Sequence, residues 1–166
     1  MIDVIERLAL LNRNLGALRL YALVDGAQYQ IHRGVRVEDK NGFYSLFRGT
    51  QDAALAHAGP WLVDTEYFDE AIVSDLSRLE RDAPAVSWII ASQSLEGLAQ
   101  LLQLNLDTKM PDGRTALLRF WDPRVLVSLT EVLSAEQRQS FFGHVFEWHL
   151  LHNGKRAWIG TQHADA

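Results

Sequence analysis

The sequence predicts a single α/β domain in which helices flank a mixed β-sheet and a β-hairpin ends the chain. Two observations lead to this prediction. Between residues 61 and 102, segments rich in β-branched and aromatic residues alternate with segments whose apolar residues recur at helical spacing. Near the C-terminus, Asn153-Gly154 lies between two strand-like stretches, and this dipeptide is the strongest two-residue indication of a hairpin turn.

The composition narrows the class of protein. The chain has 166 residues, 48% of them hydrophobic and 22% charged, which is the profile of one compact domain. Its 16 basic and 21 acidic residues are dispersed, so no basic block is present to bind nucleic acid. The absence of cysteine excludes disulfides, thiol catalysis and cysteine-ligated zinc. The acidic N-terminal segment does not suit a signal peptide, and no stretch has the ~20 apolar residues of a membrane span. We therefore expect a cytoplasmic protein whose partners are neither nucleic acid nor membrane.

An amphipathic helix is predicted at the N-terminus. Asp3 and Glu6 have the spacing of a capping box, and Gly16 is expected to end the helix. An apolar stripe at helical spacing lies between them. The stripe consists of Val4, Ile5, Leu8, Leu11 and Leu15.

The central segments predict the strands of the sheet and the helices that cover it. Residues 18–24 are apolar enough for a buried strand, which a turn at Asp25-Gly26 ends. Residues 28–41 carry no pattern that predicts regular structure. The segments that follow are predicted as strands at 43–47, 61–64 and 85–91, and as helices at 69–80 and 94–102, the latter capped by Ser94.

A hairpin is predicted around residues 110–113, where proline and glycine take the second and fourth positions of a type I turn. A three-residue loop pairs Lys109 with Thr115 and Met110 with Arg114, and it requires a positive φ at Gly113. A one-residue shift of register would mix the two faces of the hairpin. In the preferred register one face is apolar and holds Leu104, Leu106, Met110, Ala116, Leu118 and Phe120.

Two capped helices are expected after this hairpin. Asp122-Pro123 is a strong helix start, because the carboxylate caps a backbone N–H and proline has none to satisfy at the first helical position. Ser134 and Gln137 form a capping box for a short helix that Gly143 closes.

The terminal hairpin can also be placed in register. A two-residue Asn153-Gly154 loop pairs Leu150 with Ala157 and Trp148 with Ile159. The face expected to pack on the domain holds Phe146, Trp148, Leu150, Ala157 and Ile159. The opposite face holds Val145, Glu147, His149, Leu151, Arg156 and Trp158. The predicted organisation is an N-terminal helix and lead-in (1–20), a core (21–143), the hairpin packed on the same domain (144–160) and a tail (161–166).

The outer face of this hairpin is the candidate partner-binding surface. Large apolar groups among polar ones, on an element near the chain end, suit a binding hot spot. The alternative is that a neighbouring helix or loop covers them, since tryptophan is usually mostly buried. The candidate residues are Val145, Leu151, Arg156 and Trp158.

Side chains of the kind that carry catalysis are better explained here by simpler structural roles. Asp25, Asp64 and Asp122 each follow a strand, where α/β proteins often place active sites, and three such carboxylates are able to hold a divalent ion. Each also suits a local role as turn, strand end or helix cap, and we favour those roles. The candidate metal ligands His144, His149 and His152 are interpreted as titrating surface histidines, because strand alternation separates His149 from His152. No metal and no cofactor is predicted.

Five phrases occur in a characteristic order, at residues 21–27, 45–50, 59–64, 106–114 and 118–125. Together they resemble the type VI secretion effector-adaptor family, the Tap or TEC chaperones, long catalogued as a domain of unknown function. Within these phrases, the positions that look like determinants of the fold are Asp25, Gly26, Gly49, Pro60, Gly113, Arg119, Asp122, Pro123 and Arg124.

The resemblance implies a non-catalytic adaptor. Such proteins bind a cognate toxic effector and the C-terminal part of the trimeric VgrG spike, and they assist loading of the effector onto the secretion system. The family supplies no catalytic residues or cofactor to carry over. The alternative from the residues themselves is a small divalent-metal-dependent hydrolase or phosphotransferase using Asp25, Asp64 and Asp122, which requires the three carboxylates to converge. A ligand-binding module with an apolar pocket is a third possibility.

Overall fold

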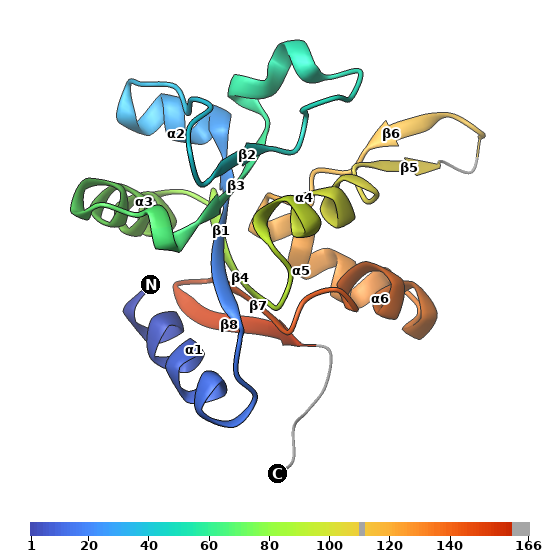
Figure 1. Cartoon of the computed structure of the whole chain (residues 1–166). Coiled ribbons are helices and arrows are strands. Elements are labelled where there is room, and N and C mark those ends of the chain that lie inside the picture. The colour runs from blue at the N-terminus through green and yellow to red at the C-terminus, as the bar shows by residue number, and fades with distance from the viewer. Residues whose placement is uncertain (110–111, 161–166) are drawn as a thin grey trace.

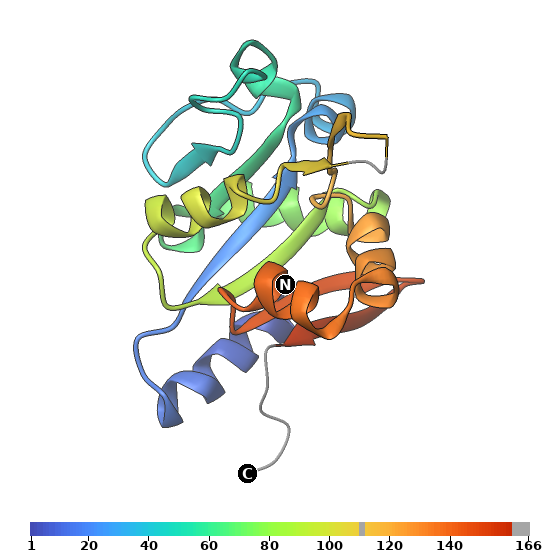
Figure 2. The same cartoon turned by 90° about the vertical axis from the view of Figure 1, so that its right-hand side faces the viewer.

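The computed structural model describes residues 1–109 and 112–160, and within them a six-stranded sheet carries helices on both faces (Figures 1 and 2). The strands of the main sheet lie in the order β2-β3-β1-β4-β7-β8. Their bounds are β1 Arg19–Asp25, β2 Phe43–Ser45, β3 Pro60–Asp64, β4 Val86–Ala91, β7 Glu147–His152 and β8 Lys155–Gly160. A separate two-stranded ribbon is formed by β5 Asp107–Lys109 and β6 Thr115–Leu117.

The single α/β domain with a C-terminal hairpin is confirmed, but the sheet is antiparallel at every pairing rather than mixed. The reason is the position of β1. Strands β3 and β4 are joined through a helix and run parallel to each other, as the strand–helix alternation indicates. However, β1 lies between them and pairs antiparallel with both, so no parallel pair of strands is adjacent.

Helices cover both faces of the sheet. Helices α1 (Ile2–Asn14), α2 (Gly26–Arg33) and α3 (Glu70–Asp82) lie on one side, and α4 (Leu95–Gln103), α5 (Pro123–Val132) and α6 (Ala135–Phe142) on the other (Figure 1). Two short 3-10 helices, η1 (Ala53–Ala58) and η2 (Thr65–Tyr67), flank β3. Because strand side chains alternate, each face has its own apolar core: one contains Tyr21, Ile89 and Trp148, and the other Ala22, Trp88 and Ile90.

Most predicted helix starts are confirmed by their caps. Ser94 accepts a hydrogen bond from the Gly97 N–H, and Ser134 and Gln137 form the expected capping box of α6. The capping box predicted for α1 is wrong. That helix begins at Ile2 without a side-chain cap, which places Asp3 inside its first turn. The Asp3 carboxylate instead bonds to Arg156 from β8, a partner too distant in the chain for a local pattern to show.

The segment 28–41, for which no structure was predicted, begins inside a helix. Asp25 was expected to end β1 as a turn, yet its Oδ1 accepts from the Gln28 N–H at 3.0 Å and thereby caps α2. Gly26 is needed because its backbone lies against the η1 loop: a Cβ there would lie 2.5 Å from the His57 carbonyl oxygen. Gly34 then ends the helix in the left-handed conformation.

The β5–β6 ribbon has the predicted register. Lys109 pairs with Thr115, and Gly113 has a φ of +85°. Leu106 and Phe120 are buried in the same core, against which Leu118 packs, as predicted. Leu104 is an exception, since it caps the C-terminus of α4 and is 75% exposed. The predicted pairing of Met110 with Arg114 lies outside the described residues.

Candidate partner-binding surface

The terminal hairpin has the predicted register. Leu150 pairs with Ala157 and Trp148 with Ile159, while Asn153 and Gly154 take the positive φ values of a two-residue turn. Trp148 and Leu150 are fully buried, and Ile159 packs beside them. Strand β7 joins the hairpin to the sheet through β4, so β8 is an edge strand with one side unpaired among residues 1–109 and 112–160.

Val145 and Phe146, the two residues before the hairpin, each point to the opposite side of the sheet from the one predicted. Val145 is only 3% exposed and belongs to the core under α5 and α6, whereas Phe146 packs on the other core. The prediction failed because β7 begins at Glu147, so strand alternation does not extend to these positions. The Val145 N–H donates to the Phe142 carbonyl oxygen in the turn that leaves α6. Val145 is therefore part of the core and not of the outer surface.

Helix α1 covers much of the hairpin's outer face, through ion pairs. The Arg7 guanidinium donates to Glu147 in β7, with Nε 3.0 Å from Oε1. From β8, Arg156 bonds to Asp3 in α1 (Nε to Oδ2, 2.7 Å) and to Glu80 in α3. The buried Glu80 also accepts from the Trp88 indole at 2.7 Å. Part of the alternative considered from the sequence, that a helix covers this face, is thus correct.

The ionisation of these groups reflects their burial and pairing. The hydrogen bond from Arg156 holds the pKa of Asp3 far below its ordinary range. Burial opposes the charge on Arg156, but the bonds to Glu80 and Asp3 outweigh it and raise the pKa of the guanidinium. Burial likewise opposes the charge on Glu147, but Arg7 and His149 lower the pKa of its carboxyl. Asp3, Glu147 and Arg156 are therefore charged at neutral pH.

His149 is not the surface histidine that was predicted. It is 5% exposed, and its Nε2 lies 2.8 Å from Glu147 Oε2. Burial lowers the pKa of the imidazole despite the neighbouring carboxylate. The Trp158 ring lies beside it, with the two ring centroids 6.4 Å apart. His152 lies at the turn end of β7, away from α1, and is exposed as expected.

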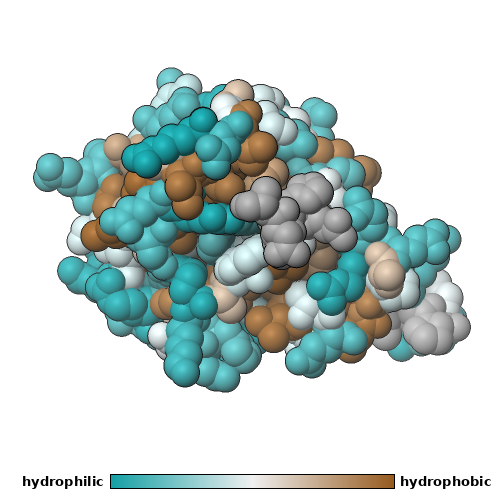
Figure 3. All heavy atoms as spheres, turned by 90° about the horizontal axis from the view of Figure 1, so that it is seen from below, coloured by the Kyte–Doolittle hydropathy of each residue, from teal (hydrophilic) through white to brown (hydrophobic). Residues whose placement is uncertain are grey.

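Trp158 is the large apolar group that α1 leaves uncovered. It is 52% exposed on β8, beside Arg156 and His149 on the same face, and Leu151 is half-buried nearby. The indole lies over Gly160, where an added Cβ would be 2.4 Å from its Cζ3 atom. Seen from the α1 and β8 end, apolar surface is broken up by polar side chains (Figure 3). Of the four candidate residues, Trp158 and Leu151 are accessible, Arg156 is held in ion pairs, and Val145 is buried.

The three aspartates of the alternative metal site do not converge. Asp25 lies at the end of β1, where it pairs with Pro60, whereas Asp64 pairs with Tyr21, four residues earlier in β1. Four residues of extended strand separate the two aspartates by about 13 Å along the sheet. Among residues 1–109 and 112–160, no group of three or more potential ligands is placed to hold a metal ion.

Each of these carboxylates has a local role instead. Asp64 caps η2 and binds Arg19, with Oδ2 2.7 Å from Nη2. Asp122 accepts from the Arg124 N–H at 2.9 Å, as predicted for the cap of α5, and is paired with the Arg124 side chain. Arg119 approaches Asp25 at 3.4 Å. Both arginines are thus paired with carboxylates at the strand ends.

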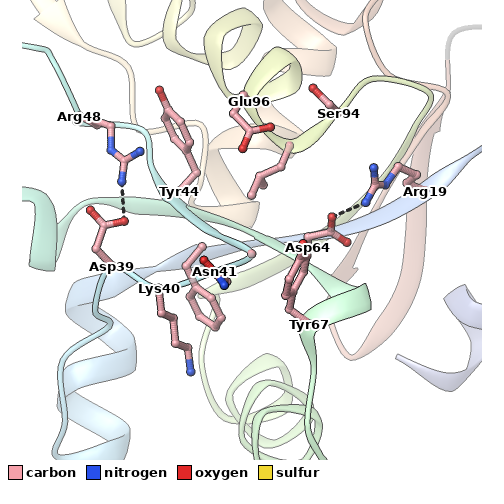
Figure 4. A pocket seen from close by; sticks show the side chains of 13 residues that line it. Arg19, Asp39, Lys40, Asn41, Tyr44, Arg48, Asp64, Tyr67, Ser94 and Glu96 are labelled. Carbon is pink, nitrogen blue, oxygen red and sulfur yellow. Dashed lines mark hydrogen bonds and ion pairs between the residues drawn. The ribbon is translucent and has the colours of Figure 1, made fainter.

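A polar hollow of about 470 Å³ lies beside Asp64 (Figure 4). Its lining carries charged side chains of both signs, and Arg19–Asp64 and Arg48–Asp39 are already paired across it. Since these charges compensate each other, the hollow has no evident preference for an anion or a cation.

The ion pairs that connect α1 and α3 to the hairpin are what the sequence reasoning missed. Glu80 is a charged residue next to the buried Leu79 on α3. A carboxylate at such a position needs a cation nearby, and this requirement was the available indication of the ion pair. The residue that supplies the cation, Arg156, is 76 positions away.

Comparisons with known proteins give a family match. A family model described as a domain of unknown function (DUF4123) matches residues 20–140. No curated protein and no solved structure matches the chain. In the described part of the chain, no helix is long and apolar enough to cross a membrane.

Proposed function

The chain belongs to the DUF4123 family, and from that premise we propose that it is a non-catalytic cytoplasmic adaptor of a type VI secretion system. In this proposal it binds a toxic effector and the C-terminal part of the VgrG spike, and it thereby loads the effector for export. The five phrases that resemble the effector-adaptor family all lie inside the matched residues 20–140.

The observation that carries the proposal is the half-exposed Trp158 on the edge strand β8. Tryptophan is enriched in binding hot spots, where burial of its large ring contributes much of the affinity. We propose that Trp158 and Leu151 are the anchors for one of the two protein partners. Within the described part of the chain, the outer edge of β8 has no paired strand, so its backbone groups are available beside them to an extended partner segment.

The surroundings of Trp158 support this role. Its ring rests on Gly160 and beside His149, and the neighbouring Arg156 is fixed by Asp3 and Glu80. A side chain already held in place loses little conformational entropy on binding. In this proposal Arg156 fixes the conformation of the surface around Trp158 and does not offer a free charge to the partner.

The local roles of the three strand-end carboxylates support a non-catalytic function. Asp25, Asp64 and Asp122 are used as helix caps and in ion pairs with Arg119, Arg19 and Arg124. In that arrangement the three aspartates stabilise the turns that follow the strands.

The test is co-purification from a bacterium that carries this gene and an active type VI system. The tagged full chain is expected to retain an effector toxin and a VgrG protein, and recovery of neither would contradict the adaptor function. Trp158→Ala and Leu151→Asp should each weaken retention of one partner, by about 2 kcal/mol for a true hot spot.

Two matched variants control for nonspecific effects. Leu55→Asp and Leu104→Ala alter side chains that are also exposed but lie on η1 and at the end of α4. They should leave retention unchanged. If Trp158→Ala and Leu151→Asp stay folded and bind as the controls do, the docking surface lies elsewhere.

A further inference from the structure

An apolar hollow of about 210 Å³ opens on the opposite edge of the sheet from the hairpin, between α2, α3 and residues 34–43. Its floor is formed by Val24 of β1, Val63 of β3 and Leu76 of α3, all of them core residues. Side chains in protein cores normally leave few voids larger than a water molecule. An opening of this size into the core has room for an apolar group from outside.

The size of the hollow suits one side chain rather than a larger ligand. A cavity of roughly 150 Å³ lined by aliphatic groups is enough to bind benzene, whereas pockets for drug-sized molecules begin near 300 Å³. Two aromatic rings, those of Tyr29 and Phe43, form part of the walls. Aromatic rings attract one another in edge-to-face or offset contacts, so the lining favours an aromatic occupant.

The mouth of the hollow carries positive charge. Lys40 places its ammonium 4.4 Å from the centre of the Phe43 ring, and it points away from the polar hollow beside Asp64 (Figure 4). Arg36 also lines the mouth, and in the described part of the chain neither cation has a carboxylate partner. Glu38 is the acidic residue there, so the lining keeps an excess of one positive charge on a chain whose net charge is −5.

We propose that this hollow is a docking pocket for an aromatic side chain carried by an acidic segment of a partner protein. The ring fills the space above Val24, Val63 and Leu76, and carboxylates on either side of it meet Arg36 and Lys40. The exposed side chain of Val35, which also lines the hollow, extends the contact surface. This site is separate from Trp158, so it gives the protein a second surface on the opposite edge of the sheet.

The probes are three short peptides, added to the isotope-labelled full chain and followed by NMR. One has a central phenylalanine between two acidic residues on each side, the second has alanine in the centre, and the third has lysines in place of the acidic residues. The phenylalanine peptide should shift the methyl signals of Val24, Val37 and Leu76. It should bind about tenfold or more tightly than the alanine peptide, since burial of the ring contributes roughly 1.5–3 kcal/mol.

The charge preference is tested by reversing the charge of the side chains at the mouth of the hollow. Arg36→Glu combined with Lys40→Glu changes exposed side chains only, and it should make the lysine peptide bind better than the acidic one. Arg78→Glu, an exposed arginine on α3 outside the hollow, should leave the preference for the acidic peptide intact. Ile72→Trp, which fills the hollow from its wall, should abolish binding of both.

Two results would overturn the proposal. One is equal binding of the phenylalanine and alanine peptides, or no shift of the three methyl groups at millimolar peptide. The other is a charge preference that the double variant does not change. Either result leaves the role of Trp158 in partner retention unaffected, so failure here is distinguishable from failure of the adaptor function.

Discussion

The face of the sheet under α4, α5 and α6 is packed by apolar and aromatic side chains, and the buried Asp25, Asp64 and Asp122 at the strand ends each cap a helix, whereas the face under α1 and α3 buries glutamates that cap none. On the first face, aromatic rings meet edge-on or stacked around Trp148, namely Phe120, Phe141 and Phe142. On the second, Glu80 and Glu147 are buried and neutralised by Arg156 and Arg7.

The difference shows how each face depends on its parts. Apolar contacts are many and individually weak, so the first face is held by their sum together with local caps and turns. The second face depends on a few pairs between distant segments, and removing one partner leaves a buried charge uncompensated. We therefore expect single substitutions to have their largest effect on the second face.

The sharpest test of this comparison is Arg156→Met. The change keeps an apolar chain of similar length but removes the cation from Glu80 and Asp3, and the free energy of unfolding should fall by about 3 kcal/mol. Urea denaturation measures the change. Arg124→Met is the matched control, because the Arg124 side chain is exposed to water and Asp122 keeps its bond from the Arg124 N–H, so the effect should be much smaller. Equal losses in the two variants would refute the contrast between the faces.

The β5–β6 ribbon should respond more moderately. Gly113→Val forces a β-branched residue into a positive φ and should destabilise the domain by about 1–2 kcal/mol. Gly113→Asn should be milder, since asparagine tolerates the left-handed region better. Thermal unfolding of both variants compares them, and a valine variant as stable as the asparagine one would mean that the turn relaxes.

A single helix cap on the first face should matter less again. Asp122→Ala removes the acceptor of the Arg124 N–H and should lower the free energy of unfolding by about 1 kcal/mol, while the folded fraction still binds its partners. Asp122→Asn keeps a capping oxygen and serves as the control. A variant of unchanged stability that loses a measurable enzymatic turnover would instead favour the metal-dependent reading.

The smallest expected effect is a pH dependence on the second face. His149 lies against Glu147, Arg156 and Asp3, and burial lowers its pKa below the ordinary 6.5. The unfolded chain therefore takes up a proton first, so stability is lost as the pH falls from about 6.5 towards the folded-state pKa. Denaturation series between pH 7.5 and 5 should show this decline in the native protein and a shallower one in His149→Gln. Identical slopes would place the titration elsewhere.

Much of the fold could be predicted because its determinants lie close together in the chain. The Ser134–Gln137 box, the Asp122 cap and the Asn153-Gly154 register each involve residues only a few positions apart. The candidate surface could be predicted only in part. Which residues belong to this surface depends on the contact of Arg7 with Glu147, 140 positions away, and on the start of β7 two residues after Val145. Neither follows from periodicity, which describes one segment at a time.

The central position of β1 also determines when the chain needs protection during synthesis. Residues 20–25 of β1 are buried in the finished sheet, but their partners follow much later, in β3 and in β4, which ends at Ala91. A ribosome that has made β1 but not yet β4 holds an apolar strand with an open edge in water, the kind of segment that pairs with other chains. The interval of greatest aggregation risk thus ends only when more than half of the protein has been translated.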